Sequence, residues 1–332
     1  MENLTIKQKI SQMFITGFNG QNFNFNKNFT DLLENGLGGV IFFTNNISNE
    51  KQFKDLINSI SEKSSIPPFF SIDQEGGRVE RTEKIHNGKK YLSAKNAYEM
   101  GLSYLQNQTK EISLELKSYG INMNFAPVLD VNTSSINPII GERAFSSNYS
   151  EVVSAGKMVI KEYEKYGIIP VGKHFPGHGA SIEDSHKTLP TIDLSKKELN
   201  EHIKPFYEAI NVGLPAIMVG HVLYPALDEF YPASISKTII NELLIKKLKF
   251  NGLIITDDME MNGIKGFSKL EACIRAINAG VNLFIFRDTN KEIYELIEKL
   301  TKAVEEGVIK EELIDNSINK IFNTKRQYGI IR

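Results

Sequence analysis

Apolar residues gather in eight short runs that recur along the chain, separated by segments richer in polar residues. Most of the runs are continuously apolar rather than alternating, which is typical of parallel strands that are covered on both faces. We therefore predict a buried strand in each run. The runs are residues 12–18, 38–44, 67–73, 122–130, 168–175, 215–221, 252–258 and 281–286.

The segments between the runs carry apolar residues at helical spacing, as in residues 95–120, 150–167 and 236–250. Eight buried strands that alternate with helices predict an α/β fold, a single (β/α)8 barrel of the TIM type. The alternative is an open doubly wound sheet, but no G-x-G-x-x-G follows the first run and no G-x-x-x-x-G-K-[ST] occurs. No linker or internal repeat divides the chain, so residues 1–332 are expected to form one domain.

Composition and charge narrow the range of partners. The 39 basic and 40 acidic residues are interspersed and leave a net charge of -1, so no nucleic-acid partner is expected. No apolar segment approaches the roughly 20 residues needed to cross a bilayer, and the N-terminus does not resemble a signal peptide. We predict a cytoplasmic protein with no membrane contact and no obligate protein partner. Cys273, the single cysteine, lies in a helical pattern and is expected to be a small buried residue.

Charged or polar residues end or follow most of the apolar runs, which is more regular than expected of residues that are merely exposed on the surface. In a (β/α)8 barrel the carboxyl ends of the strands meet at one face, which carries the active site. We therefore expect these side chains to share one site. They are Asp73 with Glu75, Asp130, Lys173 with His174, His221, and Asp257 with Asp258.

The residue types favour acid–base and carboxylate chemistry. His174 and His178 have the spacing of helical metal ligands, but Pro176 and Gly177 between them exclude a helix, so no metal site is predicted. A serine hydrolase is disfavoured because no G-x-S-x-G occurs. An aspartate nucleophile with a separate proton donor is what hydrolysis of a glycosidic bond requires.

Several motifs, in order along most of the chain, resemble the single-domain bacterial β-N-acetylglucosaminidases of glycoside hydrolase family three, which act in peptidoglycan recycling. The most specific is KHFPGHG followed by DSH. The resemblance implies a catalytic TIM barrel, and this chain ends without room for the second α/β domain of larger family members. The matching stretches are residues 72–81, 124–132, 141–148, 173–190, 221–228 and 253–264.

The resemblance also implies roles for individual residues. Asp257 corresponds to the nucleophile, with Asp258 beside it as a helix cap or supporting group. His186 corresponds to the acid/base and Asp184 to the residue that orients it, on a mobile loop to which Gly177 and Gly179 would give freedom. No cofactor or metal is implied. The residues that correspond to sugar-binding positions are Asp73, Arg81, Arg143, Lys173 and His174.

The implied activity is that of a retaining exo-β-N-acetylglucosaminidase that removes terminal GlcNAc from muropeptides or chitooligosaccharides. A β-N-acetylglucosaminide phosphorylase, a β-glucosidase or β-xylosidase and an inactive glycan-binding barrel stay open as alternatives. Residues 81–94 depart from the family pattern: they are polar and lack proline where the family has an aromatic-rich segment at the site entrance. Arg78 is expected to form a structural ion pair with Glu75, whereas His86 and His202 lie in polar, surface-type contexts and receive no role.

Overall fold

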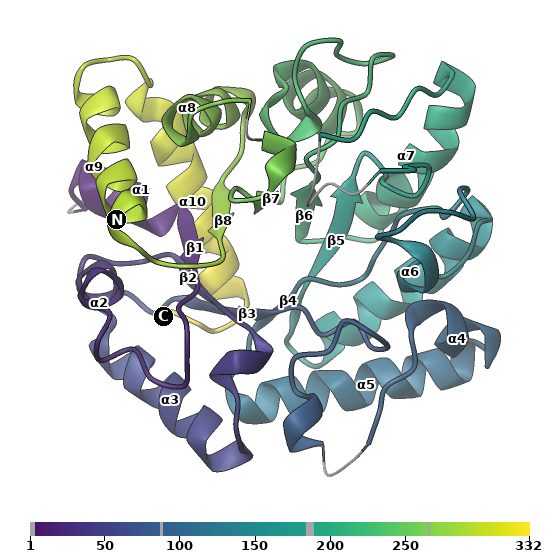
Figure 1. Ribbon diagram of the computed structural model, residues 1–332, viewed down its shortest axis with the longest axis horizontal. Coiled ribbons are helices and arrows are strands. Elements are labelled where there is room, and N and C mark those ends of the chain that lie inside the picture. Colours follow the sequence, from purple (N-terminus) through teal and green to yellow (C-terminus); the bar gives the residue numbers. More distant parts are fainter. Residues whose placement is uncertain (1–3, 87–88, 184–188, 265) are drawn as a thin grey trace.

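The computed structural model describes residues 4–86, 89–183, 189–264 and 266–332, and its strands form one closed parallel barrel (Figure 1). Neighbouring strands pair in chain order, and β8 pairs with β1 to close the ring. This confirms the predicted (β/α)8 fold, and each strand lies inside one predicted run. The strands are β1 (Phe14–Thr16), β2 (Gly39–Phe42), β3 (Phe69–Ile72), β4 (Met123–Asn124), β5 (Ile169–Phe175), β6 (Ala216–Val219), β7 (Leu253–Asp258) and β8 (Leu283–Phe286).

Helices ring the barrel, and two of them differ from the expected pattern (Figure 1). The helix expected over 95–120 is split at Gly101, whose φ of 103° does not fit a helix. The segment 236–250 forms the π-helix Thr238–Lys247. The α-helices are α1 (Ile6–Gln12), α2 (Lys27–Glu34), α3 (Glu50–Lys63), α4 (Ala94–Glu99), α5 (Leu102–Tyr119), α6 (Tyr149–Lys165), α7 (Lys196–Asn211), α8 (Lys269–Ala279), α9 (Lys291–Glu305) and α10 (Glu311–Gln327). Short 3₁₀ turns lie at Thr44–Asn46, Glu83–Ile85, Gly141–Arg143, Ala233–Ile235 and Asn262–Ile264.

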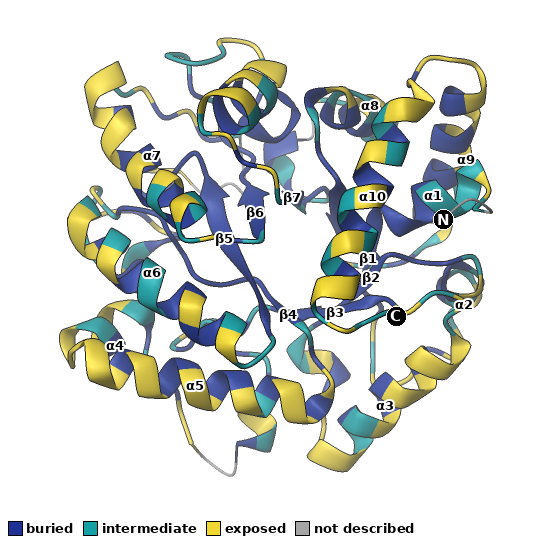
Figure 2. Cartoon of the chain, turned by 180° about the vertical axis from the view of Figure 1, so that it is seen from behind, coloured by how far each residue is buried: buried dark blue, intermediate teal, exposed yellow. Residues whose placement is uncertain are grey.

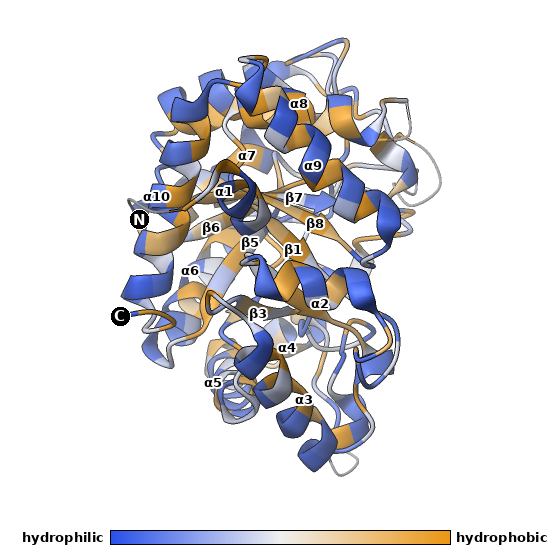
Figure 3. Ribbon diagram, turned by 90° about the vertical axis from the view of Figure 1, so that its left-hand side faces the viewer, coloured by the Kyte–Doolittle hydropathy of each residue, from blue (hydrophilic) through white to orange (hydrophobic). Residues whose placement is uncertain are grey.

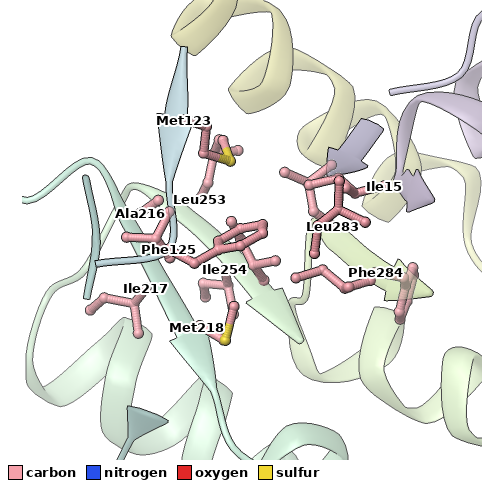
Figure 4. Packing of buried hydrophobic residues seen from close by; sticks show 14 of the residues in the cluster. Ile15, Met123, Phe125, Ala216, Ile217, Met218, Leu253, Ile254, Leu283 and Phe284 are labelled. Atoms are coloured by element: carbon pink, nitrogen blue, oxygen red, sulfur yellow. The ribbon is translucent and has the colours of Figure 1, made fainter. Parts of the chain in front are cut away.

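The core has two layers, one inside the barrel and one between strands and helices. The helices turn buried faces toward the strands and exposed faces outward (Figure 2), and the strands are the most apolar segments (Figure 3). Inside the barrel, side chains from different strands meet, among them Ile15, Leu253 and Leu283 (Figure 4). Cys273 is buried, as predicted. In the described part of the chain, no helix has the length and apolarity needed to cross a membrane.

β4 is much shorter than the run that predicted it, and this matters for the site. Pro127 has no N–H to donate to a neighbouring strand, so regular pairing ends before it. The chain still runs beside β5, because the Leu129 N–H donates to the Lys173 carbonyl at 2.7 Å. This irregular extension carries Asp130 to a position next to His174.

Candidate active site

A cavity of about 190 Å³ lies at the carboxyl ends of the strands. Asp73 follows β3, Lys173 and His174 belong to β5, and Asp257 belongs to β7, so alternate strands of the barrel bring polar groups to one place. The structure thus brings together six of the eight residues predicted from the sequence. The six that line the cavity are Asp73, Arg81, Arg143, Lys173, His174 and Asp257.

Lys173 is a buried basic residue on the wall of this cavity. Its Nζ lies 2.8 Å from Asp73 Oδ1 and 2.6 Å from Glu75 Oε1, and its side chain is 2% exposed. Arg143 donates two hydrogen bonds to the same glutamate, from Nε and Nη2, each of 2.8 Å. Burial alone would raise the pKa of Glu75, but the charges of Arg143 and Lys173 outweigh it and hold this pKa well below its usual range. Glu75 is therefore an anion that fixes both cations.

The predicted pairing of Arg78 with Glu75 is wrong. Arg78 donates instead to the carbonyl groups of Pro138 and Ile139, on the loop that leads to Arg143. Glu75 already accepts from Arg143 and Lys173, and its side chain is only 4% exposed. Sequence proximity favoured Arg78, whereas the fold brings the more distant residues to this carboxylate.

Asp257 is an ionised carboxylate at the cavity wall. Its Oδ1 accepts the N–H of Asp258 at 2.8 Å. Burial would raise the pKa of Asp257, but His174, this N–H and the charge of Lys173 lower it below its ordinary value. An aspartate that stays charged in a partly desolvated position has the electronic state of a nucleophile.

Asp258 has the supporting position that the sequence suggested. Its Oδ1 accepts the N–H of Glu260 at 3.0 Å, and its Oδ2 accepts from Arg287 Nε at 2.7 Å. His221, which we left without a role, lies buried behind it, with Nε2 3.0 Å from the Asp258 carbonyl and Nδ1 2.6 Å from Ser234 Oγ. Burial lowers the pKa of His221, in agreement with a neutral ring that donates through Nε2.

Asp130 organises the start of the β5–α7 connection. Its Oδ2 lies 2.7 Å from His174 Nδ1, and its Oδ1 accepts the His178 N–H at 2.6 Å. Burial would raise the pKa of Asp130, but these histidine contacts hold it below its usual range. Burial and the neighbouring His174 lower the pKa of His178 to about 4. His178 therefore stays neutral near pH 7.

Asp184 and His186 lie outside the described residues, so their predicted roles are tested by no contact here. The glycines upstream of them do have visible constraints. A Cβ on Gly177 would lie 2.9 Å from His202 Cβ, and a Cβ on Gly179 would lie 1.9 Å from the Val131 carbonyl oxygen. Close packing thus requires these glycines, whatever the mobility of the loop.

Both histidines that we expected on the surface are buried, so that expectation is wrong. His202 faces inward from α7, where it packs against Gly177. His86 belongs to the segment after β3 and faces Glu115 of α5. The polar residues next to each histidine in the sequence suggested that the histidine is exposed. The nearest charged neighbours are exposed, but the two histidine side chains are not.

A second hollow, of about 490 Å³, adjoins the cavity and shares Phe43, Arg81 and Arg287 with it. Phe18, Asn45 and Asp288 also line this outer groove. Arg287 was not among the residues predicted from the sequence, although it directly follows the apolar run 281–286, at the carboxyl end of a predicted strand.

Size alone does not identify the site. A larger hollow of about 1010 Å³ lies beside α4 and residues 132–147, and it is lined by none of the predicted site residues. Within the described ranges, no group of three or more His, Cys, Asp or Glu residues is arranged to hold a metal ion. Of the predicted site residues that the structure describes, all six line the smaller cavity and none lines the larger hollow.

Comparison with known proteins agrees with this geometry. The sequence profile described as "Glycosyl hydrolase family 3 N terminal domain" matches residues 5–324. Beta-hexosaminidase A of Pseudoalteromonas piscicida is 34% identical over 317 residues, which cover 87% of this chain and 53% of that protein. Beta-hexosaminidase of Haemophilus influenzae is 34% identical over 273 residues, covering 80% of this chain and 76% of that protein.

Solved structures give the same result. A glycoside hydrolase family 3 β-N-acetylglucosaminidase from Paenibacillus sp. str. FPU-7 superimposes with a TM-score of 0.92 at 34% identity, covering 98% of this chain and 63% of that chain. A M. tuberculosis protein, LpqI, superimposes with a TM-score of 0.87 at 26% identity, covering 96% of this chain and 93% of that chain. The chain spans about half the length of the Pseudoalteromonas relative.

Proposed function

Since the chain belongs to glycosyl hydrolase family 3, we propose that it is a retaining exo-β-N-acetylglucosaminidase. It would release terminal non-reducing GlcNAc from muropeptides or chitooligosaccharides. The observation that carries this proposal is Asp257, an ionised carboxylate on the wall of a small cavity that also presents Asp73, Lys173 and His174. Two relatives of the chain are beta-hexosaminidases, which supports the choice of sugar.

In the proposed reaction, an Asp257 oxygen attacks the anomeric carbon while the bond to the leaving oxygen breaks. His186 gives its proton to that oxygen, and Asp184 orients and stabilises the imidazolium. A water molecule then attacks the glycosyl–Asp257 ester, His186 takes its proton, and GlcNAc leaves with the Asp257 carboxylate restored. The roles of Asp184 and His186 rest on the family resemblance.

The cavity wall has the groups needed to hold one sugar. We assign Asp73 and Lys173 to its hydroxyls, and His174 as well, because Asp130 occupies Nδ1 and leaves Nε2 for a substrate. Arg81 contributes a buried Nε for which the described residues provide no hydrogen-bond partner. Arg143 would act mainly through Glu75, since two of its three nitrogens bind that carboxylate.

The size of the cavity favours removal of one sugar at a time. At about 190 Å³ it is smaller than the roughly 300–1,000 Å³ of pockets that take drug-sized ligands. A single ring would therefore fill it, and the leaving group would extend into the outer groove beside Phe43 and Arg287. The two arginines of that groove, Arg81 and Arg287, favour a leaving group with a carboxylate, as in a muropeptide, over a neutral chitooligosaccharide.

Two further expectations belong to this proposal. A role in peptidoglycan recycling would place the enzyme in the cytoplasm, which cell fractionation tests directly. The expectation that residues 1–332 act as one catalytic domain stays a prediction, because the Pseudoalteromonas relative is longer than this chain.

The proposal is tested with aryl β-glycosides of GlcNAc, glucose and xylose, each with and without phosphate. Wild type should release GlcNAc by hydrolysis, and Asp257→Asn should lose about 10⁴-fold or more in kcat because the nucleophile is gone. Asp55→Asn, an exposed carboxylate on α3, is the matched control and should behave as wild type. A sugar 1-phosphate product would instead identify a phosphorylase, and turnover of only the glucoside or xyloside would identify a different glycosidase.

A further inference from the structure

Residues 81–94, which depart from the family pattern, contribute His86 to a largely buried contact with Glu115 of α5. His86 Nε2 lies 2.7 Å from Glu115 Oε1, and the exposed fraction of the His86 side chain is 1%. The hydroxyl of Tyr91 donates to the other oxygen of Glu115 at 2.8 Å, and the Tyr91 ring packs edge-on against His86. A single carboxylate on α5 thus holds two points of the segment that follows β3.

An acceptor faces each ring nitrogen of His86, and the Thr82 hydroxyl, which can donate or accept, also lies 2.5 Å from Nε2. Nε2 faces the Glu115 carboxylate, and Nδ1 lies 3.3 Å from the carbonyl oxygen of Lys89, which can only accept. A neutral imidazole has one N–H and cannot satisfy both acceptors, whereas an imidazolium can. The geometry therefore fits the protonated form.

The charges around His86 act in the same direction. Burial would lower the pKa of His86, but the Glu115 and Glu80 carboxylates outweigh it and raise this pKa above its ordinary value. Glu83 lies near Glu80 on the same segment and adds negative charge. The cation of Lys89 is turned outward, where it pairs with Glu111 at 2.6 Å.

The same segment carries Arg81 to the cavity. The backbone N–H groups of Arg81 and Thr82 both donate to Gln74 Oε1, and the Thr82 side chain contacts His86 Nε2. On the far side, Lys84 donates to the carbonyl groups of Thr44 and Ile47, beside the outer groove. The guanidinium of Arg81 lies 3.6 Å from Asp73 Oδ2, and the segment that follows Arg81 is attached to α5 through Glu115, Gln108 and Glu111.

We propose that the His86–Glu115 pair is a positioning element, which helps to hold Arg81 at the sugar cavity and holds it most firmly while His86 is protonated. Sugar affinity would then weaken as the pH rises. The proposal rests on the proposed function in one respect, the contact of Arg81 with the sugar. His86 and Glu115 are positioning residues, since neither lines the cavity.

The sign of the effect follows from the raised pKa of His86. The pair contributes fully below the ordinary histidine pKa of about 6.5 and is lost as the pH rises through the higher value of the folded protein. Because Arg81 would hold the sugar in the ground state and the transition state alike, its displacement should raise KM and leave kcat nearly unchanged.

The test compares KM for an aryl β-N-acetylglucosaminide in wild type, His86→Asn and Glu115→Gln across pH 6–9. At pH 6 both variants should show a KM about fivefold above wild type, within the range of coupling between contacting residues. This ratio should fall toward one by pH 9, where wild type has also lost the pair. Lys89→Met, which removes the exposed cation of the same segment, is the matched control and should keep a ratio near one.

A double-mutant cycle separates positioning from general loss of packing. In the background of Arg81→Gln, His86→Asn should have no further effect on KM. A variant-to-wild-type ratio that does not change with pH, or a full His86→Asn effect without Arg81, would overturn the proposal.

Hydrogen exchange tests the anchor independently of catalysis. His86→Asn should reduce the protection of residues 73–86 in the free protein at pH 6, after correction for intrinsic exchange rates, and protection equal to wild type would refute the anchor. If the enzyme turns over no GlcNAc glycoside, the proposed function fails, while the exchange measurement still decides whether His86 holds the segment.

Discussion

Arg287 lines both the cavity and the outer groove, and its contacts predict how its substitution should affect the choice of leaving group. Its Nε is bound to Asp258, and its side chain is 55% exposed where the cavity opens into the outer groove. Arg287→Gln keeps a donor for Asp258 but removes the charge. We expect kcat/KM for GlcNAc–MurNAc, whose lactyl group is a carboxylate, to fall roughly tenfold, as for loss of a hydrogen bond to a charged group.

The neutral disaccharide diacetylchitobiose serves as the comparison substrate, and its kcat/KM should change less than about twofold in Arg287→Gln. Arg275→Gln on α8, outside the groove, is the control variant and should leave both values unchanged. Equal losses on the two substrates would show that Arg287 supports Asp258 rather than recognising an anion.

Single residues also show where sequence reasoning reaches its limit. Asp257, Lys173 and Asp73 could be predicted because they follow or end apolar runs, and the carboxyl ends of all strands of a barrel meet at one face. It could not assign the partner of Glu75, since that choice depends on how Arg143 returns from a loop almost 70 positions away. Short-range contacts are readable from spacing, whereas long-range pairings need the fold.

The strands were predictable and their ends were not. Continuous apolar runs indicate strands buried on both faces, and every run contains one. The run 122–130 overestimates β4 because Pro127 stops its pairing, and the helix expected over 95–120 is broken at Gly101. The backbone properties of proline and glycine therefore set where these elements end, and the pattern of apolar residues does not predict those ends.

Gly179 packs the β5–α7 connection against the extension of β4. A side chain at this position should therefore lower the free energy of unfolding. An added Cβ would lie 1.9 Å from the Val131 carbonyl oxygen, a backbone atom that cannot turn aside. Val131 follows Asp130, which accepts the His178 N–H. Gly179→Ala should therefore destabilise the protein by about 1–3 kcal/mol, the usual cost of overpacking, and reduce kcat/KM.

Urea unfolding and the aryl glycoside assay measure the two effects of Gly179→Ala. Gly266→Ala, in the β7–α8 connection, is the control, because an added Cβ there meets no atom of the described residues within 4 Å. Its stability should stay within about 0.5 kcal/mol of wild type. A Gly179→Ala protein as stable as wild type would mean that the two loops separate at little cost.

Across the whole molecule, chemistry and stability are divided between the two ends of the barrel. The cavity lies at the carboxyl ends of the strands, whereas a buried cation, Lys325 of α10, lies at the opposite end. Its Nζ donates to Gln12 Oε1 at 2.8 Å, just before β1, and lies 5.0 Å from the ring centroid of Phe69 at the start of β3. No carboxylate among the described residues pairs with it.

Burial lowers the pKa of Lys325 from 10.5 to about 7, so its charge works against folding. Between these two values the unfolded chain binds the proton and the folded protein does not, so the free energy of unfolding should fall as the pH drops from about 10 to 7. Below the lower value both states carry the proton and the penalty is constant. It is on the order of 3–5 kcal/mol, since each pKa unit is worth about 1.4 kcal/mol.

Lys325→Met removes the charge and keeps an unbranched apolar side chain between the aromatic rings of Phe69 and Phe322. We expect the free energy of unfolding of the variant to exceed that of wild type at pH 7, although loss of the hydrogen bond to Gln12 reduces the gain. The rise in this free energy between pH 7 and 10, which wild type should show, should be absent in the variant. Urea unfolding at several pH values measures both, with the exposed Lys299→Met as control. Parallel pH profiles would show that Lys325 keeps its proton in the folded protein, and kcat/KM should be unchanged, since this end of the barrel takes no part in the chemistry.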